Sequence, residues 1–293
     1  MLPAEMLKLI SYAKINLSLE VLGKRADGYH QICSILQTVD LADKLAFQDD
    51  SEVNVTCNVP ALSSEENLVT KAAMMLKDRT GCTRGASIRL TKGIPLASGL
   101  GGGSSDAATT LIGLNLFWEL GLSSADLLGI AASIGSDVPF FLYGGTALAE
   151  GRGELIRPLP YVGDWWVVLV KPPAEIARKT ARLYASLEPT DFTSGESTQM
   201  LAIVIRDRKE LNHRLLRNSF DRAAFHLFPA LNRYKDHLLA AGASHVSLSG
   251  SGPAIFSLFK ERTTGEAVYE KLRLQGMKAY LIKTVGPTSR TDE

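Results

Sequence analysis

The chain has 293 residues, of which 45% are hydrophobic and 22% are charged, and its formal net charge at pH 7 is +1. This composition is typical of a soluble globular protein, and the length predicts about two domains. A net charge so close to zero excludes binding to nucleic acid or to an anionic membrane through the overall electrostatic field.

The first half of the chain alternates between strand and helix patterns. Its expected strands cover residues 11–22, 33–47, 53–57, 86–92 and 144–149, and its expected helices cover residues 67–77, 104–120 and 123–132. A turn over residues 23–28 joins the first two strands. The 104–120 segment is apolar almost all round, which predicts a helix that is buried on most sides.

A domain boundary is expected near residues 161–164, which divides the chain into residues 1–160 and 161–293. The expected strands of the second part cover residues 165–170, 245–249, 254–259 and 278–283, and its expected helices cover residues 178–187, 220–241 and 264–275. This order is ferredoxin-like. The densest basic stretch, residues 206–217, also carries acidic side chains and is interpreted as a solvated helix face.

The three cysteines, Cys33, Cys57 and Cys82, have the spacing of neither a zinc site nor a CxxC redox pair. Their odd number favours a reduced protein. Residues 1–8 carry charge early and lack a signal-peptide core, and no apolar run reaches the ~18 residues that span a bilayer. We therefore expect a cytoplasmic protein without nucleic acid or membrane partners.

The most informative stretch is residues 95–108, Pro-Leu-Ala-Ser-Gly-Leu-Gly-Gly-Gly-Ser-Ser-Asp-Ala-Ala. Its glycines allow positive φ and close approach of a ligand to the backbone. A helix follows, with Ser104, Ser105 and Asp106 as expected capping residues, and the free N–H groups of a helix N-terminus bind anions. The loop matches neither Walker A nor the dinucleotide fingerprint. It predicts a phosphate-binding loop, with a tight turn that binds no ligand as the alternative.

This motif closely resembles the central motif of the GHMP small-molecule kinases, a superfamily that includes galactokinase and the homoserine, mevalonate and phosphomevalonate kinases. The resemblance runs from Lys14 to Phe259. It implies an α+β fold with an N-terminal S5-like α/β domain, a C-terminal ferredoxin-like domain and an active site between them. Residues 249–252, Ser-Gly-Ser-Gly, resemble a further superfamily motif that packs against the phosphate loop, although a hairpin turn is the default interpretation of the pattern alone.

Two residues match the catalytic positions of the superfamily. Lys14 lies in an apolar strand, where alternation predicts that Lys14, Asn16 and Ser18 share one face; the pattern alone favours a solvent-facing stripe. Asp137 follows a helix and is flanked by turn residues, so a plain turn aspartate is the alternative. The resemblance implies that Asp137 accepts the proton of the attacking hydroxyl. Lys14 then keeps Asp137 ionised and faces the phosphoryl group.

The resemblance also implies ATP, with Mg²⁺, as the phosphoryl donor. It predicts an ATP-binding set of Asn67, Lys92, Pro95, Gly99, Leu100, Gly101, Gly102, Gly103, Ser104, Ser105 and Asn115. An amide that serves only helix packing is an equal alternative for Asn115. The Ser105 hydroxyl is the best local candidate for a Mg²⁺ ligand. No carboxylate cluster defines a metal site, so no tightly bound protein metal is expected.

Residues 27–30, Asp-Gly-Tyr-His, resemble the segment that grips cytosine in one branch of the superfamily. The expected roles are stacking for Tyr29 and hydrogen bonding to the base edge for His30; taken alone, such a histidine is more often an ordinary loop residue. Thr180 and Tyr184 match a second stretch in which a threonine contacts the substrate and an aromatic ring stacks on the base. Their i, i+4 spacing puts them on one helix face. With Asn16, these residues form the expected substrate-binding set.

The branch resemblance implies phosphorylation of the 2-hydroxyl of 4-diphosphocytidyl-2-C-methyl-D-erythritol, in the methylerythritol phosphate route to isoprenoids. One alternative is a GHMP kinase for another small alcohol, such as homoserine or mevalonate, against which Tyr29 and His30 argue. The other is a non-catalytic nucleotide- or RNA-binding protein of the same fold, against which Lys14, Asp137 and the near-zero charge argue. A monomer or weak homodimer is expected.

The chain departs from the family pattern in two places. Lys179 stands where serine is frequent, and residues 218–221, Asn-Ser-Phe-Asp, stand where Asn-Asp-Leu-Glu is common.

Overall fold

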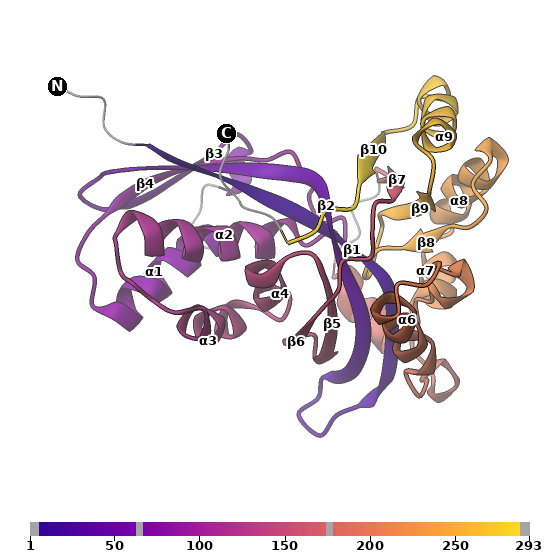
Figure 1. The fold of residues 1–293 in the computed structure, drawn as a ribbon, viewed down its shortest axis with the longest axis horizontal. Helices are drawn as coiled ribbons and strands as arrows, with labels where there is room; N and C mark the ends of the chain where they lie inside the picture. The colour runs from indigo at the N-terminus through magenta and orange to yellow at the C-terminus, as the bar shows by residue number, and fades with distance from the viewer. Residues whose placement is uncertain (1–5, 63–66, 174–177, 288–293) are drawn as a thin grey trace.

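The computed structural model describes residues 6–62, 67–173 and 178–287, which form two sheets with helices packed against each (Figure 1). The first sheet contains β1 (Leu7–Lys24), β2 (His30–Gln48), β3 (Val53–Cys57), β4 (Ala86–Thr91), β5 (Thr146–Gly151) and β6 (Leu155–Leu159). The second contains β7 (Trp166–Val170), β8 (Ser247–Leu248), β9 (Ile255–Phe259) and β10 (Ala279–Lys283). The helices are α1 (Leu68–Thr80), α2 (Gly102–Phe117), α3 (Ser124–Ile134), α4 (Val138–Tyr143), α5 (Lys179–Ala185), α6 (Glu196–Arg206), α7 (Asp221–Leu227), α8 (Ala230–Ala241) and α9 (Arg262–Leu274).

The first sheet has the strand order β3-β4-β2-β5-β6, with β1 paired to β2, and α1 to α4 gather on one side of it (Figure 1). Apolar side chains of strands and helices meet there in one core, which includes Phe47, Leu76, Ile88 and Leu111. The middle of the core is α2, buried on most sides as its apolar sequence predicts. Gly113 is needed at this contact, because a Cβ there would lie 2.5 Å from the Phe47 ring.

The second sheet has the antiparallel order β10-β7-β9-β8. Together with the helices between β7 and β8 and with α9 between β9 and β10, this is the order of a ferredoxin-like domain. Its core includes Val168, Val170, Leu238 and Leu272. The first sheet ends at Leu159 and the second begins at Trp166. A boundary between residues 160 and 161 stays a prediction.

The hairpin of β1 and β2 is long enough to serve both parts of the molecule (Figure 1). Leu9 and Phe47 lie in the core of the first sheet, whereas Leu19 and Val21 pack with the core of the second. The pairing register shifts between Tyr12 and Ala13 and again between Asn16 and Ser18. The middle of β1, which carries Lys14, therefore lies where the two parts meet.

Two expected elements differ in the structure, and three observed elements were not expected. The predicted 220–241 helix is two helices, because the chain leaves helical geometry at Phe228, directly before Pro229. The basic stretch was predicted to be a helix face, but α6 ends at Arg206 and only the short turn His213–Leu215 interrupts the loop that follows. The sequence patterns also missed α4, α6 and β6, of which α4 is only six residues long.

Within the described ranges, no helix is both long and apolar enough to cross a bilayer.

Candidate active site

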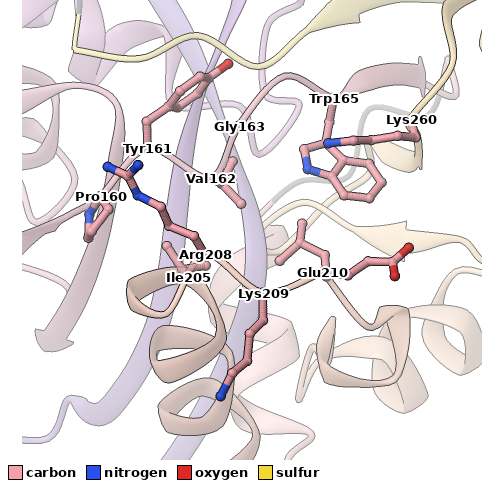
Figure 2. A pocket seen from close by; sticks show the side chains of 11 residues that line it. Pro160, Tyr161, Val162, Gly163, Trp165, Ile205, Arg208, Lys209, Glu210 and Lys260 are labelled. Atoms are coloured by element: carbon pink, nitrogen blue, oxygen red, sulfur yellow. The ribbon is translucent and has the colours of Figure 1, made fainter.

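A cavity of about 840 Å³ collects predicted residues that lie far apart in the sequence. Those that line it are Lys14, Asn16, Tyr29, His30, Gly99, Gly101, Asp137, Thr180 and Tyr184. Another cavity, of about 550 Å³, is lined by residues of the β6–β7 connection, by the end of α6 and by Lys260, which lies 4.7 Å from the Trp165 ring (Figure 2). It holds none of the predicted site residues, so the larger cavity is the candidate active site.

Lys14 and Asp137 face each other in this cavity, with Nζ of the lysine 3.7 Å from Oδ2 of the aspartate. The Lys14 side chain is only 4% exposed, which rules out the solvent-facing stripe, whereas Asp137 is 42% exposed. Burial lowers the pKa of Lys14, and the opposing effect of Asp137 does not cancel this. Asp137 stands at the N-cap of α4 without a capping hydrogen bond from its side chain, so its carboxylate faces the cavity.

Asn16 holds Lys14 in place. Its Oδ1 accepts a hydrogen bond of 2.6 Å from Lys14 Nζ, and its Nδ2 donates to Ser34 Oγ at 2.8 Å. The predicted face is wrong for Ser18, whose hydroxyl accepts a hydrogen bond from Thr198 of α6 at 3.0 Å. The register shift after Asn16 inserts an extra residue, which reverses the alternation and brings Leu19 to the cavity instead.

The glycine loop packs between β1 and the 249–252 turn. The backbone N–H of Lys14 donates to the Leu100 carbonyl at 3.0 Å, and the Ser249 hydroxyl donates to the Gly99 carbonyl at 3.1 Å. The second contact is the packing that the superfamily motif predicts. Gly99 and Gly101 have φ of 86° and 72°, and a Cβ on Gly99 would lie 2.2 Å from the Ser249 carbonyl oxygen. Only glycine therefore fits this contact.

Helix α2 starts two residues earlier than the sequence suggested. Gly101 is its N-cap, and Gly102, Gly103 and Ser104 form its first turn, so capping by Ser104, Ser105 and Asp106 is wrong. The first N–H groups of α2 therefore have no side-chain cap at the loop, which is the arrangement that binds an anion. The other loop residues shape the backbone: the Pro95 carbonyl accepts from Ser98 Oγ at 2.6 Å, and the Leu100 side chain is fully buried.

Lys92 lies below the loop and not in the cavity. Its Nζ donates to Asp106 Oδ2 at 2.6 Å and to Asp43, and its side chain is 5% exposed. Asp43 also accepts the backbone N–H groups of Gly93 and Ile94 at 2.6 and 2.8 Å. Burial raises the pKa of Asp106 to about 7, although the nearby Lys92 ammonium acts to lower it. The structure therefore contradicts a free phosphate-contacting lysine and shows a buried Asp43–Lys92–Asp106 triad under the start of α2.

Ser105 does not offer a free hydroxyl to Mg²⁺. It is fully buried, its Oγ donates to the Tyr12 carbonyl at 2.7 Å, and it lies 2.8 Å from Ser11 Oγ. The predicted metal contact is thus contradicted by the hydrogen bonds that Ser105 already makes.

The two asparagines of the predicted ATP set also have structural partners. Asn67 is the N-cap of α1, where its Oδ1 accepts from the Val69 N–H at 2.9 Å, and its Nδ2 donates to the Leu62 carbonyl. Asn115 binds both the N–H and the carbonyl of Leu122, at 2.9 and 3.1 Å, and lies about 20 Å along α2 from Gly102. Of the two alternatives for Asn115, these contacts support the packing amide.

The expected base-binding residues are present, but their arrangement differs from the prediction. His30 stacks on Tyr184 with ring centroids 4.6 Å apart, and Tyr184 meets Phe220 edge to face at 4.9 Å. Tyr29 is 56% exposed and lies under the Arg152 guanidinium, 4.8 Å away. Thr180 and Tyr184 both line the cavity, as their helical spacing predicts. His30 thus occupies one face of Tyr184, and Tyr29 does not stack there.

Comparison with known proteins places this geometry in a family. Residues 67–145 match the model of the GHMP kinases N terminal domain, and residues 200–277 match that of the GHMP kinases C terminal domain. A 4-diphosphocytidyl-2-C-methyl-D-erythritol kinase of Dehalococcoides mccartyi is 44% identical over 96% of this chain and 99% of its own. The chain belongs to the 4-diphosphocytidyl-2-C-methyl-D-erythritol kinase family.

Two more members agree with this assignment. The kinase of this name from Shouchella clausii is 41% identical, with 96% of each chain covered. A crystal structure of a 4-(cytidine 5'-diphospho)-2C-methyl-D-erythritol kinase has a TM-score of 0.81 at 32% identity and covers 95% of this chain and 99% of that one. The expected α+β GHMP fold is confirmed, and the chain is an ATP-dependent small-molecule kinase.

Sequence reasoning missed several residues that line the cavity of this family member. They are Leu19, Gly28, Arg152, Gly153, Arg178, Lys179, Phe220 and Ser251, among others. Lys179 and Phe220 lie at the two places where the chain departs from the family pattern. These departures were the sequence signal that could have drawn attention to both residues. Arg152 had no such signal, because a charged residue in the hairpin between β5 and β6 is unremarkable by pattern alone.

Proposed function

We propose that this chain transfers the γ-phosphoryl group of ATP to the 2-hydroxyl of 4-diphosphocytidyl-2-C-methyl-D-erythritol. The observation that carries the proposal is the 3.7 Å pair of Lys14 and Asp137, set in one cavity between the glycine loop and the aromatic group of His30, Tyr184 and Phe220. The loop suits a polyphosphate and the aromatic group suits a flat base. The similar kinases of Dehalococcoides mccartyi and Shouchella clausii are named for the same alcohol substrate, which supports the proposal.

In the proposed reaction, the 2-hydroxyl oxygen attacks the γ-phosphorus as its proton passes to the Asp137 carboxylate, and ADP leaves. Phosphoryl transfer demands mainly positioning and charge stabilisation. Asp137 is open to the cavity, so a hydroxyl can reach it. Lys14 offers its ammonium to the charge that develops on the phosphoryl oxygens, while Asn16 fixes the direction of that ammonium.

The nucleotide phosphates are proposed to bind the uncapped start of α2 and the backbone of residues 99–103. For Mg²⁺, the nearest buried carboxylates, Asp43 and Asp106, are both bound to Lys92, and Ser105 has no free position. The residues described here thus do not form a site of their own for the ion, and no group of three or more metal-ligating side chains occurs among them. We propose that Mg²⁺ arrives on the phosphates of ATP as part of the substrate.

The loop contacts lead to a prediction for Gly99. Gly99→Ala is expected to weaken binding of a non-hydrolysable ATP analogue about tenfold, the equivalent of roughly 1.4 kcal/mol, because the added Cβ collides with the Ser249 carbonyl and displaces the loop. Isothermal titration calorimetry measures this. Gly121→Ala is the matched control, since Gly121 also has positive φ but no heavy atom within 4 Å of the added Cβ. An affinity of Gly99→Ala within twofold of wild type would show that the loop does not hold the phosphates.

The cytosine is proposed to bind against Tyr184, on the ring face that His30 covers in the structure, with His30 turning to the edge of the base. Phe220 contacts Tyr184 edge to face, which helps to hold the Tyr184 ring in place. Asn16, Tyr29 and Thr180 stay proposed substrate contacts. The cytoplasmic location and the monomer or weak homodimer stay predictions.

A second prediction follows for Tyr184. Tyr184→Ala is expected to weaken binding of the cytidyl alcohol by roughly 1–3 kcal/mol, the contribution of one base–aromatic stack, and to leave ATP affinity unchanged. Calorimetry with each ligand alone measures both values. Tyr280→Ala, on β10 outside the cavity, controls for the loss of an aromatic side chain. If Tyr184→Ala instead lost ATP affinity, the two ligand pockets would be assigned the wrong way round.

Turnover with two alcohols tests the proposed function. Methylerythritol phosphate has the same reacting alcohol as the cytidyl substrate but lacks the cytidyl group, whose binding energy helps to position the reacting centre. The expected result is a far higher kcat/KM for the cytidyl alcohol in an assay that couples ADP formation to a signal. Comparable kcat/KM values would point to a different GHMP kinase activity, and no turnover of either would favour a binding protein.

A further inference from the structure

Lys179 reaches from the start of α5 to two loops of the other side of the cavity. Its Nζ donates to the carbonyl of Ala97 in the glycine loop at 3.0 Å, and to the carbonyl of Gly252 in the 249–252 turn. The next residue, Thr180, lies 2.8 Å from Ser251 of the same turn, oxygen to oxygen. One ammonium thus joins three chain segments at the wall of the cavity that also holds Lys14 and Asp137.

The ammonium of Lys179 has no ion-pair partner among the described residues. Both of its hydrogen-bond acceptors are neutral carbonyls, and within the described ranges no carboxylate lies at ion-pair distance from it. The charged groups that act on its pKa, Lys14 and Lys171, are both positive. A half-buried cation without a counter-charge is costly, so a lysine here is best explained by an anion that arrives with a ligand.

We infer that Lys179 binds a ligand phosphate, exchanging its hold on the Ala97 and Gly252 carbonyls for the phosphate oxygens when the site fills. This inference rests on the proposed function, because both of its substrates carry phosphates. A lysine ammonium is a flexible point charge with three donors, which suits such an exchange. The phosphate belongs either to ATP or to the diphosphate of the cytidyl alcohol. The loop and the turn stay joined after this exchange, because the Ala254 N–H donates to the Ser98 carbonyl and the Ser249 hydroxyl donates to the Gly99 carbonyl.

The surroundings of Lys179 make ligand affinity depend on pH in a predictable way. Burial, and then the charges of Lys14 and Lys171, lower the pKa of Lys179 to about 8. A bound phosphate stabilises the ammonium and raises that pKa. Below pH 8 the lysine is charged with or without ligand, so affinity does not change through it. Above pH 8 the free protein loses the proton and binding must restore it, so affinity falls by up to about tenfold per pH unit.

Other charged groups face the same cavity and enter the pH dependence. They are Lys14 on β1, Asp137 at α4, Arg152 between β5 and β6, Arg178 before α5 and His30 at the start of β2. Burial lowers the pKa of His30, away from the range in question. Of these groups, Lys14 is the one expected to add a second loss of ligand affinity at alkaline pH. Lys179→Arg separates the two, because arginine keeps its charge above pH 8 while Lys14 is unchanged.

The experiment measures binding by calorimetry at pH 7 and pH 9 for wild type, Lys179→Ala, Lys179→Arg and the remote control Lys260→Ala. One arm uses a non-hydrolysable ATP analogue with Mg²⁺, and the other uses cytidine diphosphate. In one arm, Lys179→Ala is expected to bind about 10- to 100-fold more weakly at pH 7, the effect of losing one charged hydrogen bond. The ligand whose binding is weakened is the one whose phosphate Lys179 contacts. Lys179→Arg is expected to bind within about threefold of wild type at pH 7 and with a smaller loss at pH 9.

The number of protons taken up on ligand binding is a second measurement, and a lysine with a purely structural role would not change it. At pH 8.5, titrations in buffers of different ionisation enthalpy are expected to show proton uptake on binding for wild type and Lys260→Ala, and reduced uptake for Lys179→Arg. Lys179→Ala with both affinities within twofold of wild type would overturn the inference and leave Lys179 as a strap between loops. Equal uptake in wild type and Lys179→Arg would also overturn it. Failure of the proposed function would appear separately, as wild type that binds the ligands but does not turn them over.

Discussion

Asp137→Asn is expected to lower kcat by about 10²- to 10⁴-fold while the affinity for ATP stays within about twofold of wild type. Asparagine keeps the shape of aspartate but cannot accept the proton of the attacking hydroxyl. The Asp137 carboxylate has no capping hydrogen bond to α4 and is 42% exposed, so the change should not unfold the protein. Steady-state kinetics with the cytidyl alcohol, together with calorimetry for the ATP analogue, measure both quantities.

The control for this variant is Asp236→Asn, on the exposed face of α8, which removes the same charge away from the cavity. It is expected to have wild-type kinetics. A kcat of Asp137→Asn within threefold of wild type would remove Asp137 from the role of base. A loss of ATP affinity as large as the loss of kcat would mean that Asp137 acts in nucleotide binding instead.

Lys92→Met is expected to lower the free energy of unfolding by about 3–5 kcal/mol, the usual cost of leaving buried charges without their partner. The substitution strands the carboxylates of Asp43 and Asp106 beneath α2, where burial already raises the pKa of Asp106 to about 7. Urea unfolding at pH 7 measures the loss. Lys278→Met, at an exposed position before β10, is the control and is expected to change stability by less than about 0.5 kcal/mol.

The pH dependence of Lys92→Met gives the sign of the effect. A buried carboxyl whose pKa is raised in the folded state binds its proton more tightly there than in the unfolded chain. The variant should therefore regain stability as the pH falls from 7 towards 5 and lose it as the pH rises. If Lys92→Met were as stable as wild type but had a raised KM for ATP, the lysine would contact phosphate, as the family resemblance implied.

The glycine loop is predicted from its own residue types, because glycines crowded before a helix demand a physical reason. For Lys14 the pattern alone favours a solvent-facing stripe, so its proposed catalytic role comes from the family resemblance. Asp137 depends on the resemblance as well, since turn aspartates are common. The structure brings all of them to one cavity.

The predicted ligand contacts whose side chains bind other parts of the protein share a different property. Lys92, Ser105 and Asn115 are polar residues close in sequence to the loop or its helix, and the sequence does not tell whether such a side chain faces a ligand or a buried partner. Their partners come from distant segments: Asp43 for Lys92 and Tyr12 for Ser105. The bulge that turns Ser18 away from the cavity is likewise set by pairing with β2 and has no local sequence signal.

A crystal structure of the protein with the cytidyl alcohol and a non-hydrolysable ATP analogue tests the central claim most directly. The expected result is the 2-hydroxyl within about 2.6–3.2 Å of the Asp137 carboxylate, in line with the terminal phosphate on the glycine loop, and the cytosine ring against Tyr184. A cytosine bound away from Tyr184, or a 2-hydroxyl beyond the reach of Asp137 while both ligands are in place, would contradict the account.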